Sequence, residues 1–248
     1  MHTLVNTMEL TTPLAWPPAP PAARLGSHEV HVWCASLDEF RAELPRLRAT
    51  LSPDERARAA RFRLSRDRDD FVVCRGILRE LLGGYVHRDP SAIEFSYGRH
   101  GKPAVAAPRL DGPLHFNVSH SGALALYAVT AACPVGVDVE RVRTVPDFER
   151  LASQFLAPAE AGGVMALPPE KGLEGFFTCW TRKEAFLKAT GEGIGRRLGA
   201  DLPIDWQIHR LGPAPGYVAA VAYKHEAARL SCWHTSITTL RPTRPGLI

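Results

Sequence analysis

Long apolar runs are missing from this chain, and their absence limits what the protein can be. No uninterrupted apolar segment approaches the roughly 20 residues that a helix needs to cross a bilayer. The first residues also lack the basic start and apolar middle of a secretory signal. We therefore expect a globular protein with a cytoplasmic location and no membrane partner.

Cysteine is scarce and scattered along the chain. There are 5 cysteines in 248 residues, and no two of them form a Cys-x-x-Cys pair. An odd and dispersed set of this kind argues against both a zinc site and a disulfide framework. We expect buried free thiols in a reducing compartment.

Net charge is small, at +4, but it is unevenly distributed. Residues 41–79 contain eleven arginines and no lysine, against six acids. Such a segment could attract phosphates, nucleic acid or an acidic protein, and it could equally be a solvated helix face. Because no helix-turn-helix, zinc-finger or RNA-binding signature accompanies the arginines, we expect no nucleic-acid partner.

Hydrophobic periodicity predicts a mixture of helices and strands, which is the α+β class. One helix should begin after Ser52, with Pro53 at its first position and Glu55 completing a capping box. A second should run from about Asp67 until the glycine pair at residues 83 and 84 stops it. Two more helices are expected over residues 147–156 and 173–189, and strands over residues 29–35, 93–97, 114–118, 123–130, 135–141, 204–208, 217–223 and 230–234.

A proline-rich segment precedes the first predicted strand. Residues 16–21 read Trp-Pro-Pro-Ala-Pro-Pro, a run that can form neither a helix nor a central strand. We therefore treat residues 1–28 as an extension that lies outside the core.

Two carboxylates share one face of the strand predicted over residues 135–141. Alternate side chains of a strand point the same way, so Asp138 and Glu140 lie about 6–7 Å apart on one face, while Val137 and Val139 point into the core. Magnesium is usually held by one or two carboxylates together with substrate phosphates and waters. Taken alone, the pattern also fits an edge strand with a solvated acidic face.

The helix predicted over residues 173–189 carries an acid among apolar side chains. Four residues share one side of its helical wheel: Phe177, Trp180, Glu184 and Leu187. Glu184 is therefore expected to be partly buried, and a buried acid needs a partner. Lys188 follows it by four residues on nearly the same face, where a site pair or an ordinary surface ion pair could form.

Four motifs in this order resemble those of the 4′-phosphopantetheinyl transferase superfamily, specifically its surfactin-synthetase-activating (Sfp-like) branch. They are Gly-Lys-Pro at 101–103, Phe-Asn-Val-Ser-His-Ser-Gly at 116–122, Gly-Val-Asp-Val-Glu at 136–140 and Trp-Thr-Arg-Lys-Glu-Ala-Phe-Leu-Lys at 180–188. With the segment from Ser52 to Phe62 added, the likeness covers residues from about 50 to 195. The family usually has Ser or Ala where this chain has Thr181.

The resemblance implies a fold and an activity. The fold is two similar halves related by a pseudo-twofold, with a ligand cleft between them; residues 29–135 would form the N-terminal half and residues 136–248 the C-terminal half. The activity is transfer of the phosphopantetheine arm of coenzyme A to a serine of an apo acyl- or peptidyl-carrier protein, which releases adenosine 3′,5′-bisphosphate.

Carried over position by position, the resemblance also implies the site residues. The ligands of Mg²⁺, or of Mn²⁺ in its place, would be Asp138, Glu140 and Glu184. Coenzyme A would be bound by Arg58, Lys102, Pro103, Ser119, His120 and Lys188. The catalytic residues would be Glu184, Lys188 and His120. An acid on an apolar face beside a metal can have a pKa suited to proton transfer, so we assign Glu184 as the base for the serine hydroxyl, acting directly or through a metal-bound water. The three acids should converge on one ion.

The partners implied are carrier proteins or carrier domains of fatty-acid, polyketide or nonribosomal-peptide synthases, and the enzyme should act as a monomer. Residues 147–156 would contact the carrier, and the arginine-rich segment could steer it. Two other functions remain open. The chain could be a magnesium-dependent phosphohydrolase acting on another phosphate ester, or a catalytically inactive module that binds coenzyme A or a carrier.

Overall fold

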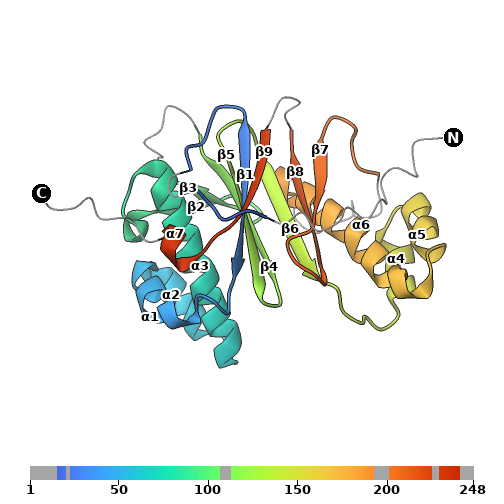
Figure 1. Ribbon diagram of the computed structural model, residues 1–248, viewed down its shortest axis with the longest axis horizontal. Helices are drawn as coiled ribbons and strands as arrows, with labels where there is room; N and C mark the ends of the chain where they lie inside the picture. Colours follow the sequence, from blue (N-terminus) through green and yellow to red (C-terminus); the bar gives the residue numbers. More distant parts are fainter. Residues whose placement is uncertain (1–15, 21–22, 107–112, 193–200, 225–228, 241–248) are drawn as a thin grey trace, which may run out of the picture.

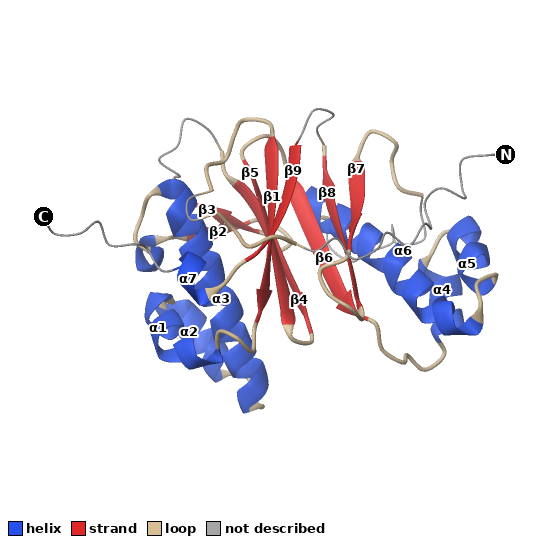
Figure 2. Cartoon of the chain, viewed as in Figure 1, coloured by secondary structure: helices blue, strands red, loops and turns tan. Residues whose placement is uncertain are grey.

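The described structure contains two larger sheets side by side, with helices on their outer flanks, and a small two-stranded sheet, β2-β3 (Figure 1). It is a computed structural model that describes residues 16–20, 23–106, 113–192, 201–224 and 229–240. One larger sheet has four strands in the order β4-β5-β1-β9, and the other has three in the order β6-β8-β7. Helices α1, α2, α3 and α7 gather at the first sheet and α4, α5 and α6 at the second (Figure 1). The predicted α+β class is confirmed (Figure 2).

The elements follow the chain in an irregular alternation. The strands are β1 (Glu29–Ser36), β2 (Phe95–Tyr97), β3 (Pro103–Val105), β4 (His115–Ser121), β5 (Leu124–Thr130), β6 (Val135–Arg141), β7 (Gln207–Leu211), β8 (Tyr217–Tyr223) and β9 (Arg229–His234). The helices are α1 (Leu44–Thr50), α2 (Pro53–Ala60), α3 (Ser65–Val86), α4 (Phe148–Phe155), α5 (Pro158–Met165), α6 (Pro169–Thr190) and α7 (Ile237–Leu240), with 3-10 turns at Arg41–Glu43 and Pro90–Ala92.

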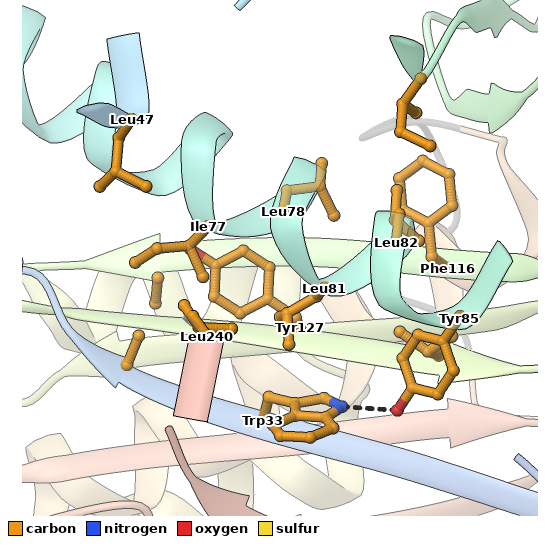
Figure 3. Packing of buried hydrophobic residues seen from close by; sticks show 14 of the residues in the cluster. Trp33, Leu47, Ile77, Leu78, Leu81, Leu82, Tyr85, Phe116, Tyr127 and Leu240 are labelled. Atoms are coloured by element: carbon orange, nitrogen blue, oxygen red, sulfur yellow. Dashed lines mark hydrogen bonds between the residues drawn. The ribbon is translucent and has the colours of Figure 1, made fainter. Parts of the chain in front are cut away.

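Helix α3 packs its apolar side on the four-stranded sheet. Ile77 and Leu81 face Tyr127 of β5, and Tyr85 accepts a hydrogen bond of 2.8 Å from the indole of Trp33 on β1 (Figure 3). The prediction that the glycine pair ends this helix is wrong. The helix continues to Val86, because burial of its last turn outweighs the helix-breaking tendency of glycine.

Helix α6 lies against β6 and β8 at very short range. A Cβ placed on Gly136 of β6 would lie 2.0 Å from the carbonyl oxygen of Ala185, so only glycine allows this approach. The valines of β6 point the other way, into an apolar layer between the two sheets that also includes Val32 and Leu126. Val137 and Val139 are thus buried as predicted, and the alternation sends Asp138 to the opposite face.

The proline-rich segment does not lie wholly outside the core, so that prediction is wrong for its described part. Trp16 is only 6% exposed and packs in the layer between the sheets. His234 of β9 donates to Pro17 and accepts from Ala19, each at 2.9 Å, so the segment covers the outer edge of that strand. Residues 1–15 lie outside the described structure.

Strand β9 returns from the C-terminal part of the chain to the first sheet, where it pairs in parallel with β1. The division of the chain at residue 135 stays a prediction, as does the pseudo-twofold. Strand β7 lies three residues later than predicted, and helices α1, α5 and α7 and strand β3 were not predicted. None of the described helices is both long and apolar enough to cross a membrane.

Candidate active site

Asp138 of β6 lies buried where the two sheets meet. Its Oδ1 accepts hydrogen bonds from Lys188 Nζ at 2.6 Å and from Ser119 Oγ at 2.8 Å. Its Oδ2 is buried without a partner among the described residues. Burial raises the pKa of Asp138, and the lysine opposes that shift.

Glu140, two residues along the same strand, is closer to solvent. Its Oε2 accepts from Ser121 Oγ at 2.8 Å and from the guanidinium of Arg143 at 3.1 Å. It remains electrostatically coupled to Asp138 and to Glu184, because its charge raises the pKa of both. The side chain therefore borders the same acidic cluster from its exposed side.

Glu184 of α6 is buried on the apolar side of the helix, as predicted. It is 4% exposed, and its Oε1 has no hydrogen-bond partner within the described structure. Burial and then the charge of Asp138 raise its pKa. Lys188, one turn further on, forms its ion pair with Asp138 and also donates to Ser119 Oγ at 2.9 Å.

The donor set suits a hard divalent cation. Two buried carboxylate oxygens without partners, on Asp138 and Glu184, are costly unless a ligand covers them. The described residues nevertheless contain no group of three or more His, Cys, Asp or Glu side chains placed to hold a metal ion. The expected convergence of all three acids on one ion therefore stays a prediction. Substrate phosphates commonly complete such a coordination shell.

A pocket of about 200 Å³ opens beside these acids. Its lining comes from both sides of the junction: His100, Gly101, Lys102, Asn117, Glu184, Leu187, Lys188 and Gly191. Gly191 ends α6 in the left-handed conformation, with φ at 74°, which glycine adopts without strain. The continuation of this loop through residues 193–195 lies outside the described residues.

Lys102 reaches into this pocket from the loop before β3. Its Nζ donates to the carbonyl oxygens of Val135 at 3.1 Å and of Ala189 at 2.8 Å. Burial lowers the pKa of Lys102 to about 8. The lysine thus joins the first half of the chain to the start of β6 and to the last turn of α6, where carbonyl groups favour a cation.

Three of the other predicted coenzyme A residues lie less centrally: His120, Pro103 and Arg58. His120 points to the face of β4 opposite to that of its neighbour Ser119, and its ring is exposed. No hydrogen bond or ion pair between described residues involves that ring. Pro103 begins β3. Arg58 is exposed on α2, with its guanidinium 5.3 Å from the ring centre of Phe71.

Three residues at the junction were not predicted. Asn117 and Ser121 lie on the same face of β4 as Ser119, and Arg143 binds Glu140. The signal for the first two was present in the sequence, because polar residues alternate at positions 117, 119 and 121. Arg143 offered no such signal, since it follows the strand in a segment without periodicity.

Comparison with known proteins agrees with this architecture. Two family models cover adjoining parts of the chain: "4'-phosphopantetheinyl transferase superfamily" matches residues 134–240, and "4'-phosphopantetheinyl transferase, N-terminal" matches residues 32–134. The chain is 39% identical over 231 residues to the 4'-phosphopantetheinyl transferase HetI of Nostoc sp.. The matched region covers 88% of this chain and 98% of the relative.

Two further relatives are more distant. The 4'-phosphopantetheinyl transferase Sfp of Bacillus subtilis is 29% identical over 163 residues, covering 66% of this chain and 67% of the relative. The 4'-phosphopantetheinyl transferase AcpT of Salmonella typhimurium is 38% identical over 108 residues, covering 44% and 55%. The chain belongs to the 4′-phosphopantetheinyl transferase superfamily, with Sfp-like relatives. It is a 4′-phosphopantetheinyl transferase, as the motifs indicated.

Proposed function

We propose that this enzyme uses the acidic junction between its two sheets to transfer the phosphopantetheine arm of coenzyme A to a serine of an apo carrier protein. The observation that carries the proposal is the pair of buried carboxylates, Asp138 and Glu184, each with an oxygen that lacks a partner, beside a pocket lined by two lysines. Coenzyme A brings phosphates to that pocket, and its pyrophosphate needs positive charge around it.

The residues in and around the pocket have different proposed roles. Lys102 and Lys188 supply positive charge to the phosphates. Ser119, whose hydroxyl donates to Asp138 and accepts from Lys188, would contact coenzyme A beside them. Lys188 lies where it would stabilise the charge that accumulates on the departing adenosine 3′,5′-bisphosphate. His120, exposed on the other face of β4, and the exposed Arg58 would bind the outer phosphates, and Pro103 would border the adenine end.

Glu184 is the proposed base. In the transfer, the serine oxygen forms a bond to the phosphorus nearer the pantetheine, the bond from that phosphorus to the bridging pyrophosphate oxygen breaks, and the serine proton passes to Glu184. Burial on an apolar helix face raises the pKa of Glu184 and so favours its protonated form, which suits a group that must accept a proton.

Asp138, Glu140 and Glu184 would hold Mg²⁺, or Mn²⁺ in its place. When bound, the cation would neutralise the pyrophosphate oxygens and orient them for displacement. Before it binds, Lys188 neutralises Asp138 within the described structure, while Ser121 and Arg143 hold Glu140.

Carrier proteins or carrier domains of fatty-acid, polyketide or nonribosomal-peptide synthases are the proposed partners, with the enzyme acting as a cytoplasmic monomer. Helix α4 offers exposed positions for the contact: Glu149, Arg150, Ser153 and Gln154. The arginines of residues 41–79 would attract the acidic surface that carriers present around the modified serine. If steering operates, raising the salt concentration raises the Michaelis constant for the carrier; an unchanged constant contradicts it.

The deciding experiment is intact-protein mass spectrometry. Apo carrier proteins of all three synthase types are incubated with the enzyme, coenzyme A and Mg²⁺, and the expected result is a mass gain of one phosphopantetheine group on at least one carrier. No gain on any of them overturns the proposal. A matched reaction with a chelator in place of Mg²⁺ tests the cation separately. Transfer that survives chelation contradicts the role of the metal but leaves the proposed transfer reaction standing.

A further inference from the structure

The edges of the two sheets meet at β4 and β6 without a backbone ladder between them. Each is the terminal strand of its own sheet, and the two are not paired as neighbours. Side chains take the place of the missing ladder. Asn117 Oδ1 accepts from the backbone N–H of Val137 at 3.0 Å, Ser119 Oγ from that of Val139 at 3.4 Å, and Ser121 Oγ from that of Arg141 at 3.1 Å.

The two serines of this ladder do more than satisfy the strand edge. Each accepts the N–H of the residue that follows an acid and donates its own hydroxyl proton to that acid. Ser119 Oγ donates to Asp138 at 2.8 Å, and Ser121 Oγ donates to Glu140 at 2.8 Å. Because the hydroxyl is held by the backbone at one end, its proton points at the carboxylate in one direction only.

We propose that Ser121 is a positioning residue for Glu140. It holds Oε2 of that carboxylate toward the junction and leaves Oε1 for the cation, and this role rests on the function proposed above. The competing partner is Arg143, which binds the same Oε2 but is itself exposed. Without Ser121 the carboxylate follows the exposed arginine toward solvent, where an ion pair costs little to break.

Glu140 needs such a holder more than Asp138 does. Asp138 is buried and is fixed by both Lys188 and Ser119, so its orientation survives the loss of one contact. Glu140 has a longer side chain and a partly exposed position, and Ser121 provides its one side-chain hydrogen bond to the first sheet among the described residues. Residues that orient a metal ligand through a hydrogen bond typically contribute a factor of about 10–100 to metal affinity.

Three variants test the proposal. Ser121→Ala removes the hydroxyl, Ser121→Thr keeps it on a residue that strands favour, and Ser91→Ala is the matched control. Ser91 also donates a hydroxyl to a carboxylate, that of Asp89 at 2.5 Å, but on the 3-10 turn after α3, away from the junction. The dissociation constant of Mn²⁺ is measured by electron paramagnetic resonance of the full chain saturated with coenzyme A, without a carrier, so that no turnover occurs.

The expected result is a dissociation constant for Mn²⁺ about tenfold higher in Ser121→Ala, with Ser121→Thr and Ser91→Ala within about threefold of the unsubstituted protein. Amide hydrogen exchange at Arg141 should accelerate in the Ala variant alone, because its N–H loses its acceptor. A Mn²⁺ constant in Ser121→Ala that stays within about threefold overturns the positioning role while the transfer reaction stands. Absence of Mn²⁺ binding by the unsubstituted protein overturns the metal assignment as well.

Discussion

Two clusters of buried acid, one on each side of the molecule, differ in how their charges are matched. On the first side Glu55 is 2% exposed and lies between two arginines. Arg79 donates to its Oε2 at 2.6 Å, and Arg75 Nε lies 2.9 Å from its Oε1 as an ion pair without hydrogen-bond geometry. Arg79 also donates to the carbonyl oxygens of Pro90 and Ile93. One acid is thus surrounded by two cations that belong to the protein.

In the second cluster, at the junction of the two sheets, acidic side chains outnumber the basic ones. Asp138 and Glu184 are each 4% exposed, with Glu140 at their border, and Lys188 is the ion-pair partner of Asp138. Both buried acids keep an oxygen without a partner in the described structure. Burial is nearly equal in the two clusters, so burial does not distinguish them. The supply of positive charge does: the first cluster is complete in itself and serves the fold, while the second awaits charge from a ligand.

We call the second cluster, Asp138 and Glu184 with Glu140 at its border, the open cluster, and the first, around Glu55, the closed cluster. The largest effect should come from neutralising the open cluster. Glu184→Gln keeps the shape of the side chain but removes the proposed base and one cation ligand, so we expect the rate of carrier modification to fall by about 10²–10⁴-fold. Coenzyme A binding should remain measurable by calorimetry. Turnover of Glu184→Gln close to that of the unsubstituted enzyme removes this residue from the mechanism.

The same substitution in the closed cluster should act on stability instead. Glu55→Gln leaves two nearly buried arginines without their counter-charge, and we expect the free energy of unfolding to fall by about 3–5 kcal/mol. Glu184→Gln should change it by less than about 1 kcal/mol or raise it, because the amide removes a buried charge that lacked a partner. Urea denaturation of both variants measures the difference, and equal losses would erase the distinction between the clusters.

Lys102 extends the comparison to a half-buried cation whose hydrogen-bond partners in the described structure are two carbonyl groups. Burial lowers the pKa of Lys102 to about 8, so the charged form predominates below pH 8 and is lost as the pH rises through that value. If the charge serves the phosphates, coenzyme A affinity should fall about tenfold between pH 7 and pH 9. Lys102→Arg keeps its charge over this range and should remove the dependence; a profile identical in both proteins contradicts the role.

The smallest effect should come from the exposed pair at the border of the open cluster. Arg143→Ala breaks the contact with Glu140, but the pair lies near solvent, where such contacts contribute about 0–1 kcal/mol. We expect less than about a fivefold change in the rate of carrier modification. A loss comparable to that of Glu184→Gln would show that the open cluster extends to the surface.

Local periodicity explains which of these features could be predicted. The alternation of β6 placed Asp138 and Glu140 on one face, and the helical wheel of α6 placed Glu184 on its apolar side, because both depend only on backbone geometry. The capping box of α2 is confirmed for the same reason: Glu55 Oε2 accepts from the N–H of Ser52 at 3.0 Å. This carboxylate also takes part in the closed cluster, which no local pattern indicated.

Contacts between segments that are distant in the sequence could not be predicted. The burial of Trp16, the bridge from Lys102 to Ala189 and the hydrogen bond from Ser121 to Glu140 each join residues whose separation in the sequence carries no periodic signal. Composition misled at the proline-rich segment, because proline cannot donate to a ladder but its carbonyl group can still accept at a strand edge. All five cysteines are free thiols; Cys34, Cys133 and Cys179 are buried as predicted, whereas Cys74 and Cys232 are only partly buried.

The position of β9 has a consequence for the order in which the enzyme folds during synthesis. Strand β1 is synthesised early, but its parallel neighbour is the last of the described strands to be made. Until β9 leaves the ribosome, one edge of β1 is open and the apolar layer between the sheets lacks part of its wall. Contacts this distant in sequence are slow to form, so we expect the nascent chain to rely on late closure of the first sheet rather than on an N-terminal half that folds alone.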